Sequence, residues 1–368
     1  MKHFLETHQV KLTTIGPVFI GSGELLMKKE YILDRKKRRV SIVNPNKFFQ
    51  FLKKQHKMDS YEQFILKENA PLHVWLKKQN ISDSEIKQFL AYELDSGDIA
   101  ELNKVKPVEL FQKDLYGKPY IPGSSLKGAI RTALLGDDIY NNPELYGAES
   151  ENIRNVEFKK RTSYLKKEIN RVEQKFFFTK NRPETRRGDA VNDVMSGLRI
   201  SDSKPLSVKD LTLCQKIDVH VKGNEKELSI VRECLKPGTE VQFIMTIDRT
   251  ECKYTIEQIR QSINGFLKSY NELFLKSFSN GTLFEKDVIY LGGGVGFVSK
   301  TVTHPLLKDN PKRIQVVSEV VNNTLSKKAK IEHKHNQDRI LGVSPHTCKL
   351  TQFDGGLYQM GACEIEIM

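Results

Sequence analysis

The residues best suited to ligand chemistry lie in the stretch 116–135, where a turn and an extended segment lead into a predicted helix. Apolar residues recur there at helical spacing, and the first turn of a helix carries unpaired N–H groups and a partial positive charge. Small residues let a ligand approach, hydroxyls add donors, and basic residues four apart share a helix face. The candidate binders of this stretch are Gly123, Ser124, Ser125, Lys127 and Arg131. The pattern predicts a site for a sugar-phosphate chain, and the alternative is an ordinary capped helix with a solvated basic face.

Two glycine-containing stretches are further candidates. Near the N-terminus, Gly21 and Ser22 belong to an expected flexible loop. Late in the chain the candidates are a glycine cluster and the lysine after it: Gly292, Gly293, Gly294, Gly296 and Lys300. This cluster is not a Walker A loop, and Phe297 stands where a dinucleotide fingerprint needs its third glycine. We expect its backbone to lie against a phosphate chain, the alternative being a tight turn that needs positive φ.

The segment 154–187 concentrates positive charge. It carries twelve basic and four acidic residues, more than half of the excess of the whole chain, and it includes three successive phenylalanines at 176–178. A helix ending at those aromatics and a following loop with Arg186 and Arg187 are predicted. Basic residues mixed with aromatics suit single-stranded RNA, whereas a solvated helix and a mobile loop is the plainer alternative.

Composition agrees with a polyanion partner. The formal net charge is +13 and the sequence pI about 9.3, which favours nucleic acid first and an anionic membrane second. The five cysteines are scattered without a Cys-x-x-Cys pair and read as reduced thiols. No signal sequence and no run of eighteen apolar residues is present, so we expect a cytoplasmic protein with no membrane partner.

Catalytic and metal-binding patterns are weak. A zinc site could use His333, His335, His346 and Cys348, but each pair of these is a common accident of sequence. A metal-independent ribonuclease could use a histidine as general base and a lysine to stabilise charge, and the sequence does not single out which histidine. Asp137–Asp138 and Asp189 with Asp193 read as loop or helix-cap residues. We expect no catalytic residue, no metal and no cofactor.

The elements that position these residues indicate an α+β protein. Strands are expected at 9–15, 31–34, 40–43, 108–115, 198–202, 211–221, 228–234, 240–247, 288–291, 348–350 and 357–367. Helices are expected to begin at Asn44–Pro45 and at Gly123, with a long helix at 255–278. A helical insertion at about 47–106 carries the sole tryptophan, Trp75, which we expect in a core. The order strand–helix–strand recurs in two halves, 1–190 and 191–368, which suits two fused ferredoxin-like units with helical insertions.

Several of these stretches resemble a known family. The segment 122–131, Pro-Gly-Ser-Ser-Leu-Lys-Gly-Ala-Ile-Arg, is similar to the signature of the RAMP superfamily of CRISPR-associated proteins. The segments 19–23, 291–297, 344–349 and 361–365 are similar, within that superfamily, to the family of fifth subunits of the type III-A Csm effector complex. The resemblance runs from the first strand to the last and is vague at about 47–106.

The resemblance implies two ferredoxin-like (RRM-like) units and a non-catalytic RNA-binding subunit. Such a subunit caps the Csm backbone at the 3′ end of the CRISPR RNA, contacts neighbouring Csm backbone subunits with target RNA nearby, and supports maturation of that end through a nuclease acting in trans. A related backbone subunit cleaves RNA with an aspartate after its first strand; the matching region 24–30 here has none, so that activity is not carried over. An endoribonuclease that itself trims CRISPR RNA and a protein–protein adaptor remain as alternatives.

Overall fold

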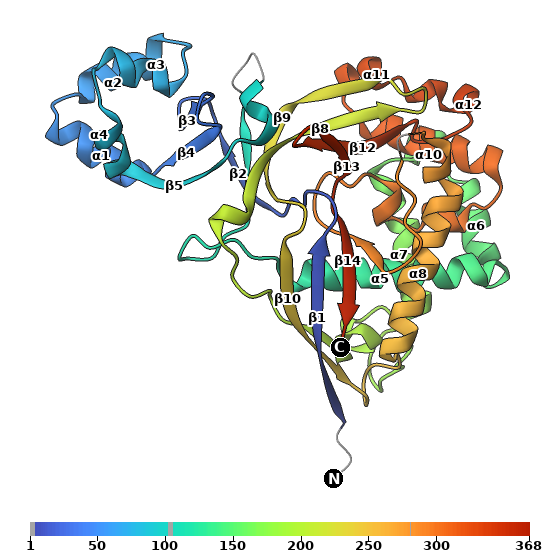
Figure 1. The fold of residues 1–368 in the computed structure, drawn as a ribbon. Coiled ribbons are helices and arrows are strands. Elements are labelled where there is room, and N and C mark those ends of the chain that lie inside the picture. The colour runs from blue at the N-terminus through green and yellow to red at the C-terminus, as the bar shows by residue number, and fades with distance from the viewer. Residues whose placement is uncertain (1–3, 102–105, 280) are drawn as a thin grey trace.

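Two β-sheets and the helices packed on them make up the chain, as Figure 1 shows for this computed structural model. The structure describes residues 4–101, 106–279 and 281–368. The expected α+β class is confirmed. No helix in these described ranges is long and apolar enough to cross a membrane.

The first sheet is fully antiparallel, with the order β11-β14-β1-β10-β7. Its strands are β1 (Leu5–Thr14), β7 (Leu198–Ile200), β10 (Glu240–Asp248), β11 (Val288–Tyr290) and β14 (Ala362–Ile367). Burial alternates along β1 and β10, so one face of this sheet is covered and the other is open. The N-terminal strand thereby pairs with the C-terminal strand, as Figure 1 shows.

Helices α5 (Gly123–Asn141) and α8 (Ile256–Leu273) pack against each other and on the covered face of the first sheet. Two glycines make the close approach possible. A Cβ on Gly136 would lie 2.3 Å from the Phe266 ring, and one on Gly265 would lie 1.7 Å from Asp137 Oδ1. The core between helices and sheet includes Leu12, Leu126, Ile130, Met245 and Ile263, all nearly inaccessible.

The second sheet has nine strands, with the order β2-β6-β9-β8-β5-β4-β3 and with β12 and β13 added beside β8. Its strands are β2 (Gly21–Leu26), β3 (Tyr31–Asp34), β4 (Arg39–Val43), β5 (Leu90–Asp95), β6 (Val108–Phe111), β8 (Leu211–His220), β9 (Glu225–Leu235), β12 (Thr347–Phe353) and β13 (Gly356–Gln359). One edge of β8 pairs with β9, while the other meets β5 at its start and β12 at its end. Both sheets draw strands from either side of residue 190, so neither sheet corresponds to one of the expected halves.

A helical lobe stands between β4 and β5, on the left of Figure 1. Its helices are α1 (Pro45–Lys54), α2 (Met58–Lys67), α3 (Leu72–Lys78) and α4 (Asp83–Ile86). Asn44 caps α1, where a helix start was predicted, and Ser82 forms a capping box on α4. Trp75 is 1% exposed in the lobe's own core, as predicted. The expected helical insertion at about 47–106 is helical only in its first part, because residues 90–95 form β5. Residues 102–105 of the expected insertion lie outside the described residues.

The remaining helices are α6 (Gly147–Arg154), α7 (Lys166–Phe177), α9 (Thr303–Leu306), α10 (Asn310–Thr324), α11 (Lys327–His333) and α12 (Asp338–Leu341). Helix α7 ends at Phe177, so the aromatic run terminates it as predicted. One expectation was wrong. Residues 21–23 form the start of β2 rather than a flexible loop, because β2 pairs with β6. All five cysteines are free and buried.

Candidate nucleic-acid interface

Helix α5 begins at Gly123, as predicted, but its first turn is already supplied with an anion. The backbone nitrogen of Gly123 donates to Asp202 Oδ1 at 2.9 Å. Pro122 occupies the N-cap position, so neither Ser124 nor Ser125 caps the helix. A Cβ at position 123 would lie 2.2 Å from the carbonyl oxygen of Ile200. The glycine is therefore required by contact with the end of β7, whether or not a ligand approaches it.

The four other predicted residues of this stretch differ in accessibility. Ser124 is exposed, whereas Ser125, Lys127 and Arg131 are half-buried. The Arg131 guanidinium pairs with Asp193 at 2.7 Å and Glu173 at 3.4 Å. It also lies 3.9 Å from the centre of the Phe177 ring. Arg131 is thus held largely by the protein itself, while Lys127 forms no ion pair within the described part of the chain.

The two glycine stretches meet at Phe19. The backbone nitrogen of Gly293 donates to the Phe19 carbonyl at 2.7 Å, and a Cβ on Gly292 would lie 2.1 Å from that oxygen. Gly292, Gly294 and Gly296 have φ of 78°, 87° and 97°, so the positive-φ turn that the sequence left open is present. Gly21 is exposed next to the Phe19 ring, and Ser22 donates to the Leu110 carbonyl at 3.2 Å.

Three adjoining hollows form a track across the molecule, which we call the basic groove. The first, of about 820 Å³, lies on α7 and the turn before it. The second, of about 350 Å³, shares Ser163, Lys166 and Asn170 with the first. The third, of about 570 Å³, shares Tyr164, Lys300 and Thr301 with the second. The cations that line the groove are Lys159, Lys160, Lys166, Lys167, Arg171, Arg131, Lys300, Lys216 and Lys349.

The groove collects only some of the predicted residues. Arg131, Gly294, Gly296 and Lys300 line it. The others are not among the residues that line its three hollows: Gly21, Ser22, Gly123, Ser124, Ser125, Lys127, Arg186, Arg187, Gly292 and Gly293. The structure therefore links the start of the basic segment, the middle of α5 and the second part of the glycine cluster.

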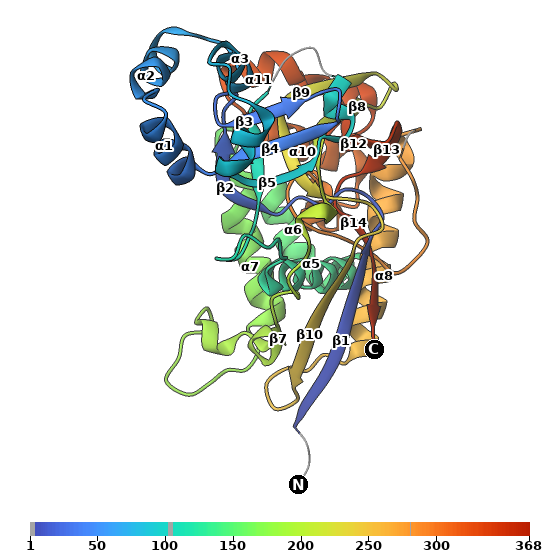
Figure 2. The same ribbon diagram turned by 60° about the vertical axis from the view of Figure 1, so that its left-hand side comes forward.

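Four of the twelve basic residues in the segment 154–187 form ion pairs within the protein instead of lining the groove. Lys175 pairs with Glu149 at 2.9 Å, Arg161 pairs with Glu319, and Glu251 binds both Lys180 and Arg182. Those two cations hold the pKa of Glu251 at about 2. Arg186 and Arg187 are exposed in the segment between α7 and β7, which projects from the body in Figure 2.

Sequence reasoning missed the inner end of the groove. Lys216 on β8 and Lys349 on β12 face the third hollow, and Lys349 pairs with the buried Asp218 at 2.6 Å. The register sets Lys349 opposite Asp218 and Thr351 opposite Lys216. The sequence signal was the alternation of charged residues 216 and 218 within a largely buried strand, and it did not reveal that this strand pairs with β12.

Lys216 has no hydrogen-bond or ion-pair partner among the residues that the structure describes. Burial, and next the neighbouring Lys349, lower the pKa of Lys216 to about 8. Arg232 lies close by: its Nη1 would be 2.9 Å from a Cβ on Gly294 and is buried without a hydrogen-bond partner. Lys216, which has no carboxylate partner, and the unpartnered Nη1 of Arg232, whose Nε pairs with Glu109, favour an anionic ligand at this place.

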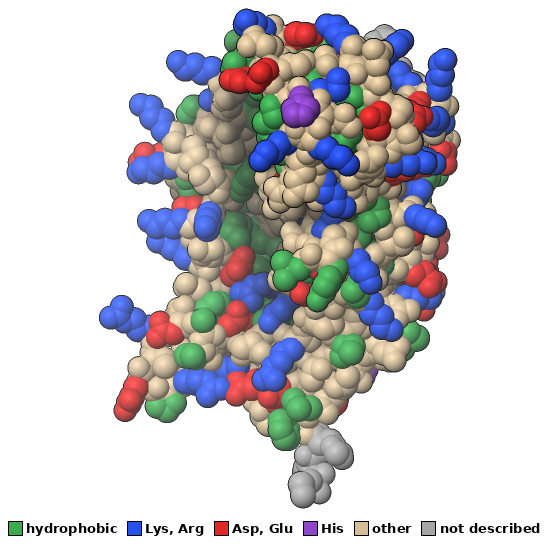
Figure 3. Space-filling view, turned by 90° about the vertical axis from the view of Figure 1, so that its left-hand side faces the viewer, with side chains coloured by type: hydrophobic (Ala, Val, Ile, Leu, Met, Phe, Trp, Pro, Cys, Tyr) green, Lys and Arg blue, Asp and Glu red, His purple; other side chains and the backbone are tan. Residues whose placement is uncertain are grey.

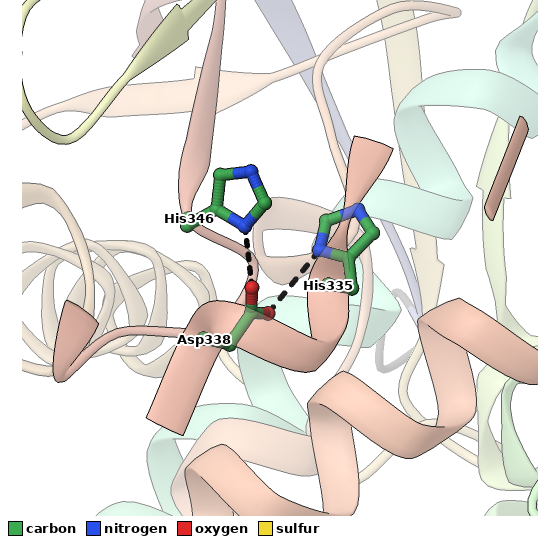
Figure 4. A group of neighbouring side chains, drawn as sticks. All are labelled: His335, Asp338 and His346. Atoms are coloured by element: carbon green, nitrogen blue, oxygen red, sulfur yellow. Dashed lines mark hydrogen bonds and ion pairs between the residues drawn. The ribbon is translucent and has the colours of Figure 1, made fainter. Parts of the chain in front are cut away.

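The histidine cluster differs from the zinc site considered above. His335, Asp338 and His346 have ligand atoms within 4.8 Å of one another. The rings of His335 and His346 both donate through Nδ1 to the Asp338 carboxylate, as Figure 4 shows, and Ser344 donates to it at 2.5 Å. Burial alone would raise the pKa of Asp338, but these hydrogen bonds hold it below its usual value. Cys348 belongs to a hydrophobic core instead, where burial raises its pKa to about 12.

This cluster is explained by its own hydrogen bonds. A buried carboxylate with three donors is satisfied, and it ties α12 to the turn that leads into β12.

The face of the molecule in Figure 3 shows Lys and Arg side chains around a hollow that has hydrophobic side chains at its floor. Positive rims with apolar floors suit a single-stranded nucleic acid better than a small neutral ligand.

The comparisons with known proteins show the class of protein to which this fold belongs. The RAMP superfamily model matches residues 11–315, so the chain belongs to the RAMP superfamily. Its relatives include the CRISPR system Cms protein Csm5 of Enterococcus italicus, 32% identical over 340 residues that cover 82% of this chain and 81% of the relative. The Csm5 of Streptococcus thermophilus is 30% identical and covers 82% of each chain. That of Mycobacterium tuberculosis is 27% identical and covers 100% of this chain and 99% of its own length. Within the superfamily, these are proteins of the Csm5 family, as the sequence resemblance indicated.

Solved structures show the same fold. A chain of the cryo-EM structure of a Csm–crRNA–target RNA ternary complex in a type III-A CRISPR-Cas system superposes with a TM-score of 0.66 and 20% identity, covering 98% of this chain and 100% of that chain. The crystal structure of T. onnurineus Csm5 superposes with a TM-score of 0.59 and 17% identity, covering 96% and 99%. At this identity the likeness concerns the fold.

Proposed function

We propose that this chain is a non-catalytic CRISPR RNA-binding subunit of a type III-A (Csm) interference complex. It caps the backbone at the 3′ end of the CRISPR RNA and supports maturation of that end, with neighbouring Csm subunits, target RNA and a nuclease acting in trans as partners. The relatives named Csm5 support the complex. The observation that carries RNA binding is the continuity of the basic groove through shared residues.

The groove is suited to one strand of RNA. Its first hollow offers Lys159, Lys160, Lys167 and Arg171 against one acidic residue, Glu168. Phosphates of a single strand pair with such cations, and aromatic rings along the path accept unstacked bases. The start of α5, where Ser124 is exposed and Ser125 and Lys127 are half-buried, is proposed as a flanking contact outside the groove. The exposed arginines at 186 and 187 are proposed as a second flanking contact.

We also infer that the first sheet with α5 and α8 is a ferredoxin-like unit assembled from distant segments. In chain order it runs β1, α5, β7, β10, α8, β14, and in space its strands are ordered β7-β10-β1-β14. Both helices pack on one face, as the split βαβ pattern requires. The second ferredoxin-like unit stays a prediction.

Salt-dependent RNA binding tests the proposal. Purified protein is titrated with a fluorescent single-stranded RNA at several salt concentrations, using wild type, Lys166→Gln and Lys300→Gln. Each lost phosphate contact reduces the slope of log K against log salt by about 0.7 for single strands. Lys204→Gln is the matched control, since Lys204 is exposed and lies outside the groove, and its side chain bonds only Gln242 among the residues that the structure describes. Equal slopes for groove and control variants would show that charge alone, and no defined track, attracts the RNA.

One arrangement favours a second candidate, an endoribonuclease that trims the CRISPR RNA itself. His335, oriented by Asp338, lines the same hollow as Lys216 and Lys349, and a positioned imidazole with a nearby ammonium is a general base and a charge stabiliser. Incubating the protein with labelled precursor RNA, with and without a chelator, decides between the two functions. Specific cleavage that is lost in His335→Asn would replace the non-catalytic proposal with this one.

A further inference from the structure

The turn before α7 has an unusual backbone. Ser163, Tyr164 and Leu165 follow one another with φ of 48°, 54° and 57°. Left-handed conformations of non-glycine residues are strained and rarely occur in succession, and strain of this kind is concentrated at functional sites. Leu165 is 1% exposed and anchors the turn in the core, while the Tyr164 side chain is exposed. The anchored turn therefore presents the Tyr164 side chain at the surface.

Tyr164 stands where the second and third hollows of the groove join. It lines both hollows, together with Lys300 and Thr301. Its ring centre is 5.4 Å from that of Phe297, and the two planes are inclined by 35°. Phe297 follows directly after the glycine cluster and is only half-buried. The two rings therefore form an aromatic wall at the mouth of the third hollow.

The inside of the third hollow is cationic. Lys216, Lys300 and Lys349 line it, and Arg232 lies beneath Gly294. Two carboxylates balance this set, Asp218 on Lys349 at 2.6 Å and Glu109 on Arg232 at 2.5 Å. Two of the four cations, Lys216 and Lys300, have no carboxylate within ion-pair distance in the described ranges. A wall of aromatic rings beside surplus positive charge recognises a ligand with a planar base and a phosphate.

We propose that the third hollow of the groove holds one unstacked nucleotide of the bound RNA. Its base lies against the Tyr164–Phe297 wall, and its phosphate lies on Lys216 and Lys300. The hollow's volume of about 570 Å³ accommodates one nucleotide rather than a stacked run. This inference rests on the proposed function, since the rest of the strand follows the first two hollows.

The ring of Tyr164 is tested by substitution. Tyr164→Ala is expected to weaken RNA binding by about 5- to 150-fold, the loss measured when a base loses its aromatic partner. Tyr164→Phe keeps the ring and is expected to bind as wild type does. Tyr116→Ala is the matched control, because Tyr116 is also exposed but lies in a turn outside the groove. Phe297→Leu keeps an apolar side chain without the ring and is expected to weaken binding in the same direction as Tyr164→Ala. Circular dichroism and melting curves show whether each variant is folded.

Photocrosslinking locates the nucleotide. A set of RNAs carries a single 5-iodouridine at successive positions, and crosslinked peptides are identified by mass spectrometry. We expect one position to crosslink to Tyr164 or Phe297, with neighbouring positions crosslinking elsewhere in the groove. Wild-type binding by folded Tyr164→Ala, with crosslinks only outside the third hollow, overturns this inference and leaves the proposed function standing. Failure of the wild-type protein to bind RNA at low salt overturns the proposed function itself.

Discussion

Asp202 Oδ1 lies 2.9 Å from the backbone nitrogen of Gly123, at the first turn of α5. A carboxylate at a helix N-terminus takes the place that an external phosphate would occupy. The glycine–serine stretch is therefore first a structural junction, at which the end of β7 contacts the start of α5. The groove supplies the cations that the helix terminus alone does not.

Two glycines of α5 are expected to differ in their effect on stability, because only one of them contacts β7. Gly123→Ala is expected to destabilise the protein by about 1–3 kcal/mol, because its Cβ would lie 2.2 Å from the Ile200 carbonyl oxygen. Gly128→Ala is expected to stabilise it by about 0.5–1 kcal/mol, because Gly128 is exposed within the helix and its Cβ would meet nothing within 4 Å. Urea denaturation gives both values. Equal stability of wild type and Gly123→Ala would mean that β7 moves freely away from α5.

The two basic residues of α5 are expected to behave differently. Arg131→Met removes the partner of Asp193 and Glu173 and should lower the free energy of unfolding by about 1–3 kcal/mol. Lys127→Met should leave stability unchanged or slightly higher, because burial already lowers the pKa of this unpaired lysine. Lys127→Met should nevertheless weaken RNA binding if the start of α5 is a flanking contact. Denaturation and RNA titration of both variants check this, and loss of stability in Lys127→Met would contradict it.

Local signals in the sequence identified many elements correctly. The cap at Asn44, the capping box at Ser82 and the aromatic end of α7 at Phe177 each depend on residues a few positions apart. Val10 and Leu12 alternate with polar residues and are buried in β1 as expected. Such features depend on neighbouring residues alone, so sequence patterns can predict them.

The inner part of the groove depends on contacts that sequence patterns do not carry. Lys216 and Lys349 are 133 positions apart and meet because β8 pairs with β12. Tyr164 faces Phe297 only because the strained turn before α7 directs it there. Gly21 was read as a loop because glycine is frequent in turns, yet pairing with β6 makes it part of a strand. In each case a contact with a segment distant in the sequence, which local preference does not reveal, is part of the outcome.

Asp338 predicts acid sensitivity. Its folded-state pKa is depressed by its hydrogen bonds, so the stabilisation is fully present above the unfolded pKa of about 3.9 and is lost as the pH falls through the folded value. Asp338→Asn should destabilise the protein by about 3–5 kcal/mol at pH 7, since it disrupts a buried charged network. The difference from wild type should shrink below pH 4. Denaturant titrations of wild type and Asp338→Asn between pH 3 and 7 measure the difference in the free energy of unfolding. A difference that stays constant across that range would contradict a stabilising, ionised Asp338 carboxylate.

Lys216 predicts that RNA affinity depends on pH. Its pKa is lowered to about 8 by burial and by Lys349, with Arg232 adding to the effect and Asp218 and Glu109 opposing it. Its protonated fraction therefore falls from about 0.9 at pH 7 to about 0.1 at pH 9. If only the ammonium form holds the phosphate, affinity falls up to about tenfold over this range.

The expected direction is a weaker complex at higher pH. Burial lowers the pKa of His333, which faces the same hollow, so this ring is neutral throughout the range. Lys216→Arg keeps its charge at pH 9 and should bind RNA with little change between pH 7 and 9. Lys216→Gln should bind with the affinity of the wild type at pH 9 and be equally insensitive. A wild-type affinity that stays constant from pH 7 to 9 would show that Lys216 does not touch the phosphate, because RNA contact requires the charged form of this lysine.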